Sequence, residues 1–125
     1  MHLVIKMTNK YFIFYVKNEY LNLVEQYPSF LKFIFNESIN SFFSKQNEEI
    51  FEPMLNKKIY LIEYLNKRMD FVCANQVYYI LNKITDETIT VKINEFSLEV
   101  TEIEGKHIIY DVLKEFSKNF YMILS

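Results

Sequence analysis

The pattern that most restricts the possible folds is a two-residue alternation of apolar and polar side chains in the second half of the chain. It runs through residues 88–93 and, after a short Asn-Glu turn, through residues 96–101. The preceding segment, Val77–Ile84, is apolar on both faces, as in a central strand. Because successive side chains of a strand point to opposite faces and the connections are short, these three segments predict an antiparallel meander.

A helix and a final strand are expected after the meander. Gly105, the one glycine of the chain, suits the turn from the third strand into the helix, since glycine adopts backbone angles that other residues avoid. Apolar residues spaced i, i+3, i+4, i+7 then predict a helix with a single apolar stripe. The stripe consists of Ile109, Val112, Leu113 and Phe116. The closing letters, FYMILS, predict a buried strand.

The first half of the chain predicts one strand and three helices. Aromatic and β-branched residues indicate a strand over Tyr11–Lys17, and an asparagine N-cap then favours a short helix over Glu19–Gln26. A proline suits the first turn of each of the next two helices, Ser29–Phe43 and residues 54–68. The centre of the last helix, KIYLIEYL, also fits a strand.

The order of these elements predicts a single α+β domain over residues 1–125. Its sheet should be mainly antiparallel, with an N-terminal strand, a three-strand meander and a C-terminal strand, packed with three to four helices. Half of the residues are hydrophobic and about a quarter are charged, which is typical of a chain that folds rather than stays disordered.

Composition also argues against several partners and compartments. The net charge is −2 and Arg68 is the only arginine, so direct binding to nucleic acid is not expected. Cys73 is the only cysteine and therefore forms no internal disulfide. The longest apolar run, YFIFYV, is far shorter than the ~20 residues of a membrane helix. We expect a cytosolic, cytoplasmic protein with no membrane partner.

No catalytic motif is present. His2 and His107 are far apart in sequence and neither has a second ligand at metal spacing, while a single glycine excludes both a phosphate loop and a nucleophile elbow. The acidic segments NEEIFE and EVTEIE are expected on solvated faces, Cys73 in the core, and His107 on the surface at a helix start. We therefore predict no catalytic, cofactor-binding or metal-binding residue, which argues against an enzyme.

The short helix carries more apolar residues than a helix packed on a sheet needs. Tyr20, Val24 and Tyr27 recur at i, i+4, i+7, while Leu21 and Leu23 lie on its other sides. Either the helix is buried on several sides, or part of it contacts a partner, for which aromatic residues are well suited. The sequence leaves both interpretations open.

Both ends of the chain resemble a known family. The stretch YFIFYVKNEYLNLVEQYPSFLKFIF is similar to the N-terminus of the sporulation inhibitor of replication proteins (SirA) of spore-forming Firmicutes. EFSLEVTEIEGKHIIYDVLKEFSKNFYMIL resembles their C-terminal strand, turn, helix and strand, and DFVCANQVYYILNKI resembles their first meander strand. The segment from Asn36 to Arg68 is shorter here than in the family.

The resemblance implies a small inhibitor that binds the N-terminal domain of the replication initiator DnaA. In the family, two aromatic positions one turn apart on the first helix contact DnaA, and they fall on Tyr20 and on Val24, which is not aromatic. A polar family contact falls near Glu49. We expect Tyr20, Val24, Tyr27 and Glu49 to bind the partner, with Tyr20 and Val24 turned outward, and Phe33 to lie in the core. The alternative is a phage or mobile-element inhibitor of a different host protein, such as a defence nuclease.

Overall fold

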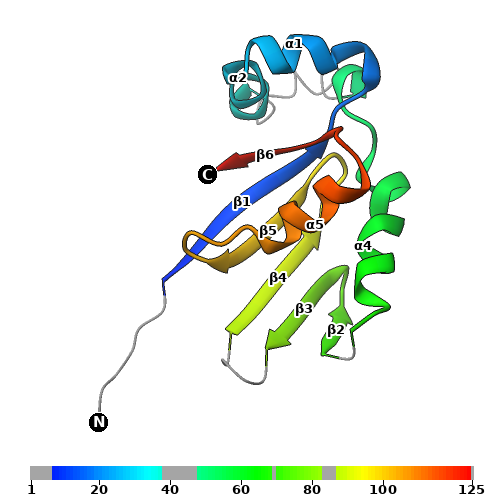
Figure 1. The fold of residues 1–125 in the computed structure, drawn as a ribbon, viewed down its shortest axis with the longest axis vertical. Helices are drawn as coiled ribbons and strands as arrows, with labels where there is room; N and C mark the ends of the chain where they lie inside the picture. The colour runs from blue at the N-terminus through cyan, green and yellow to red at the C-terminus, as the bar shows by residue number, and fades with distance from the viewer. Residues whose placement is uncertain (1–6, 38–47, 69, 83–86, 125) are drawn as a thin grey trace.

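The computed structural model describes residues 7–37, 48–68, 70–82 and 87–124, which form an α+β fold around one sheet. The sheet is antiparallel throughout, and its strand order is β2-β3-β4-β5-β1-β6 (Figure 1). The strands are β1 (Thr8–Tyr15), β2 (Phe71–Ala74), β3 (Val77–Asn82), β4 (Glu87–Ile93), β5 (Leu98–Ile103) and β6 (Phe120–Leu124). The predicted fold class is confirmed.

The helical segments follow the predicted order with different lengths. They are the 3-10 helix η1 (Asn18–Tyr20), α1 (Leu21–Gln26), α2 (Ser29–Glu37), the 3-10 helix η3 (Met54–Lys57), α4 (Lys58–Leu65) and α5 (Ile108–Phe116). The segment KIYLIEYL is helical, so the strand alternative was wrong. The predicted continuation of the second helix to Phe43 lies outside the described residues.

The larger hydrophobic core lies between one face of the sheet and helices α4 and α5 (Figure 1). Directly paired residues of neighbouring strands share a face, so Tyr11 lies beside Val100 and Ile13 beside Leu98 on this face. The helices contribute Leu61, Leu65, Ile109 and Leu113, all at most 1% exposed. The stripe predicted for the helix after Gly105 is thus confirmed at Ile109 and Leu113, whereas Phe116 is 39% exposed.

A second hydrophobic cluster lies on the opposite face, at the β1–β6 side of the sheet. Phe14 and Ile123 face away from the first core and pack with residues of α1, α2 and the segment before η3. Its buried members are Phe14, Val16, Leu21, Val24, Leu31, Ile50, Phe51 and Ile123. Strand β1 therefore separates two cores, which accounts for its dense aromatic sequence.

The rest of this second face is open to solvent. Val72, Tyr79 and Leu81 are 65%, 42% and 39% exposed, because no described helix covers β2 and β3 on that side. The prediction that Val77–Ile84 is buried on both faces is wrong for this face. Strand β2 was not predicted either, and its edge position leaves Cys73 exposed instead of in the core.

The environments of Phe33 and His107 also differ from the predicted ones. Phe33 is 55% exposed, whereas Leu31, two residues earlier, is 3% exposed. Two residues correspond to about 200° around a helix, so only one of these side chains can face the second cluster. His107 is half-buried rather than fully solvated, and its ring meets the Tyr11 ring edge-on with centroids 5.2 Å apart.

Candidate partner-binding surface

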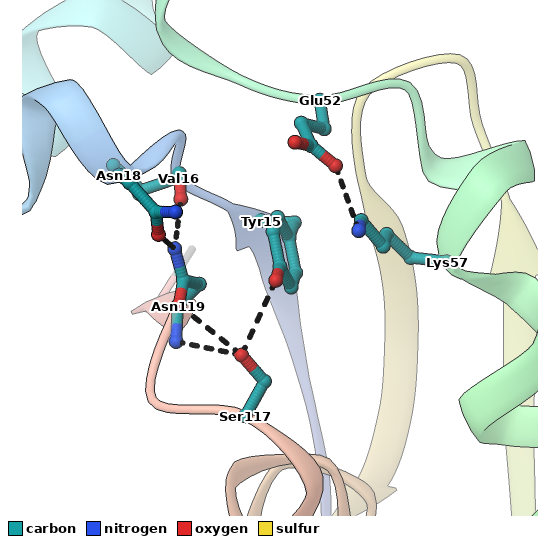
Figure 2. A network of polar contacts seen from close by, with 7 residues as sticks. All are labelled: Tyr15, Val16, Asn18, Glu52, Lys57, Ser117 and Asn119. Atoms are coloured by element: carbon teal, nitrogen blue, oxygen red, sulfur yellow. Dashed lines mark hydrogen bonds and ion pairs between the residues drawn. The ribbon is translucent and has the colours of Figure 1, made fainter.

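The start of the first helical segment is fixed by a buried asparagine. Asn119, 5% exposed, donates from its side chain to the Val16 carbonyl and to Asn18 Oδ1, both at 2.7 Å (Figure 2). The Val16 N–H donates in return to the Asn119 carbonyl at 2.9 Å. Asn18 therefore acts as a tertiary contact at the first residue of η1 and not as the predicted N-cap of a longer helix.

Further contacts hold the end of β1 in place (Figure 2). The Asn119 N–H donates to Ser117 Oγ at 3.2 Å, and this hydroxyl lies 3.3 Å from the Tyr15 hydroxyl. The Lys57 ammonium lies 4.1 Å from the centre of the Tyr15 ring and 2.8 Å from a Glu52 carboxylate oxygen. Side chains from the loop before β6 and from η3 thus position the point where β1 leads into η1.

A second chain segment lies alongside this point. An isolated antiparallel bridge joins Val16 to Phe51, and the Lys17 N–H donates to the Ile50 carbonyl at 2.9 Å. The Lys17 ammonium also donates to the Glu48 carbonyl at 2.7 Å. These bonds place residues 48–50 next to Lys17, which directly precedes η1.

Two of the predicted partner-binding residues meet on this surface. The Tyr20 hydroxyl donates to Glu49 Oε1 at 2.7 Å, across 29 positions of sequence. This hydrogen bond raises the pKa of Tyr20, and partial removal from water and the charges of Glu49 and Glu19 raise it further. The Tyr20 ring is partly buried against the second cluster while Glu49 is exposed, so the pair lies at the protein surface.

The expectation that Val24 points outward is wrong, because Val24 is 1% exposed and belongs to the second cluster. Tyr20 ends a 3-10 helix and α1 begins only at Leu21, so the predicted i, i+4 relation does not hold across the junction. Within α1 the buried stripe is Leu21 and Val24. Tyr27 is 60% exposed, as a partner contact requires, and Leu23, not predicted as a contact, is 36% exposed.

Sequence analysis also missed a buried carboxylate. Glu102 is 1% exposed and accepts hydrogen bonds from the Tyr11 hydroxyl and from the N–H groups of Ile108 (2.9 Å) and Ile109 (3.1 Å). Burial and the bond to Glu102 raise the pKa of Tyr11 far above that of an ordinary tyrosine. The prediction of a solvated face for EVTEIE is wrong at this position, where Glu102 satisfies first-turn N–H groups of α5.

A small cavity and a larger groove lie elsewhere among the described residues. The cavity measures about 70 Å³, well below the ~300–1,000 Å³ of most ligand pockets, and adjoins Glu102, Arg68 and Lys106. The groove, about 400 Å³, lies between the start of α2 and β6. Among the described residues, no three His, Cys, Asp or Glu side chains are grouped as a metal site, and no helix could cross a membrane.

Comparison with known proteins adds no relative to these observations. No family model matches the sequence, and no curated protein matches it. Tyr20 and Glu49, two of the residues expected at the partner surface, are in direct contact in the structure.

Proposed function

We propose that this protein is a non-enzymatic inhibitor of DNA replication initiation, which acts in the cytoplasm by binding the N-terminal domain of DnaA, as the family that it resembles does during sporulation. The observation that supports this most is the hydrogen bond between Tyr20 and Glu49. Both residues are expected at the partner surface from the same family resemblance, and they lie on segments far apart in the sequence. A random pair of positions would rarely lie in direct contact at the surface.

The partner is proposed to be a protein and not a nucleic acid. The guanidinium of Arg68, the only arginine, donates to both carboxylate oxygens of Asp70 at 2.8 and 2.6 Å. That pairing occupies the group best suited to bidentate contacts with phosphate or guanine. An effect on DNA replication would therefore require binding to another protein rather than to DNA.

The binding test compares two tyrosines. Tyr20→Ala should weaken binding of the purified DnaA N-terminal domain by about 2 kcal/mol, roughly 30-fold in Kd, as an aromatic hot spot does. Tyr79→Ala is the matched control, because Tyr79 is 42% exposed on β3, near the opposite edge of the sheet from β1 and β6. Isothermal titration calorimetry gives the affinities, and thermal unfolding of each variant verifies that it is folded.

Two outcomes would contradict the proposal in different ways. If the unmodified protein does not bind the DnaA domain at micromolar concentration, DnaA is not the partner. If both substitutions change the affinity equally, the surface at Tyr20 is not the contact.

The alternative partner, a different host protein such as a defence nuclease, is favoured by one observation. The second aromatic contact position of the family falls on Val24, which is buried here and offers a partner no side chain. Affinity capture from the native host, followed by mass spectrometry, separates the two candidates: recovery of DnaA supports the first, and recovery of a nuclease without DnaA supports the second.

A further inference from the structure

The surface around Tyr20 is unusually acidic for this chain. Glu19, Glu48 and Glu49 are all exposed, and the whole chain has a net charge of only −2. Neither Glu19 nor Glu48 forms an ion pair with another described residue. The neighbouring cation, Lys17, has its ammonium directed to the Glu48 carbonyl. This ammonium lies at the same surface, where three carboxylates therefore outnumber one ammonium and the net charge is negative.

Apolar side chains are also exposed on the same helical segment. The Tyr20 ring is half-buried, and on α1 Leu23 is 36% exposed and Tyr27 60% exposed. No lysine or arginine occurs in η1 or α1. Protein interfaces commonly combine an aromatic centre with a polar rim, and the charges of that rim select partners and accelerate encounter.

We propose that this surface docks on a protein site in which an apolar pocket is flanked by lysine or arginine side chains, and that attraction to Glu19 and Glu48 accelerates association. The inference rests on the proposed function, since it takes this surface as the contact. Glu49 has a separate task, because its carboxylate already accepts the Tyr20 hydroxyl and so holds the ring in position. Complementary charge would then set the rate of encounter, and the aromatic contact would set the lifetime of the complex.

The test measures the association rate with the immobilised DnaA N-terminal domain by biolayer interferometry at about 30, 100 and 300 mM NaCl. For the unmodified protein the rate should fall roughly tenfold over this range, because salt screens exposed charges. The double variant Glu19→Gln with Glu48→Gln should associate several-fold more slowly at the lowest salt and depend less on salt. Its dissociation rate should change little.

The control variant carries the same change in net charge elsewhere. Glu63→Gln with Glu115→Gln alters exposed residues of α4 and α5, and it should associate like the unmodified protein. If both double variants associate at the same rate, or if the unmodified protein shows no salt dependence, the inference is overturned while DnaA binding stands. If no binding occurs at any salt concentration, the proposed function falls and the inference falls with it.

Discussion

Replacing Glu102 tests the buried contact that joins the sheet to α5. Its carboxylate accepts three hydrogen bonds, from the Tyr11 hydroxyl and from the N–H groups of Ile108 and Ile109. Glu102→Gln keeps the size of the side chain but replaces one acceptor oxygen with an NH₂ donor. Whichever way the amide turns, at least one N–H group of α5 then faces another donor.

The magnitude follows from the groups left without a partner. A hydrogen bond to a charged group contributes about 1.5–3 kcal/mol, and a buried donor without an acceptor costs about 1–3 kcal/mol. We expect Glu102→Gln to lower the free energy of unfolding by about 2–4 kcal/mol. That is a large part of the ~5–15 kcal/mol free energy of unfolding that is typical of a domain. Glu102→Ala leaves all three donors without an acceptor, so this variant should fold poorly if at all.

Urea unfolding followed by far-ultraviolet circular dichroism measures the effect. With a slope of about 2 kcal/mol per molar urea, the midpoint should fall by roughly 1–2 M. The control is Glu99→Gln on the same strand, where the carboxylate is partly exposed and 3.8 Å from the Lys10 ammonium. Such a pair contributes about 0–1 kcal/mol. If the two variants unfold at the same urea concentration, the assigned role of Glu102 is refuted.

Three further predictions use the same assay. The folded pKa of Tyr11 lies above the ~10 of an unfolded tyrosine, so the unfolded chain loses this proton first and stability should decline as pH rises above about 10. Tyr11→Phe should make that decline shallower, and an unchanged decline would contradict this. Val24→Ala should cost about 2 kcal/mol of stability by leaving a cavity in the second cluster. Phe33→Ala should stay within about 0.5 kcal/mol, because Phe33 is exposed; a loss above 2 kcal/mol would mean that it is core.

The sequence predicted the fold well where a periodic pattern continued for several residues. The alternation of β4 and β5 and the stripe of α5 each depend on one face meeting a core. The structure confirms the strands and the helix, with Ile109 and Leu113 as the buried members of the stripe. Strand β2 escaped detection because it has only four residues and its turn lacks glycine. Asn75 and Gln76 instead have φ angles of 52° and 65°, as a type I′ hairpin turn requires.

The environments of Glu102 and Val24 were predicted wrongly for a different physical reason. The alternation that places Leu98 and Val100 on the core face also places Glu102 there, so the signal existed, but acidic side chains are usually solvated. Only tertiary structure could reveal that the start of α5 supplies donors for it. Val24 could not be placed from spacing, because the change from 3-10 to α-helix at Leu21 interrupts the helical period.

The change from 3-10 helix to α-helix at Leu21 also explains how one short helical segment contributes to both the core and the surface. Leu21 and Val24 attach α1 to the second cluster, whereas the Tyr20 hydroxyl reaches across to a carboxylate on another segment. Both segments are tied to the end of β1, one through Asn119 and the other through the bridge between Val16 and Phe51. The surface at Tyr20 and Glu49 is therefore held by bonds of the Asn119 side chain and of the backbone, and these bonds do not involve the side chains of Tyr20 and Glu49. For this reason we expect substitutions of exposed residues at the proposed contact surface to change partner affinity with little loss of stability, whereas substitution of Val24 should lower stability.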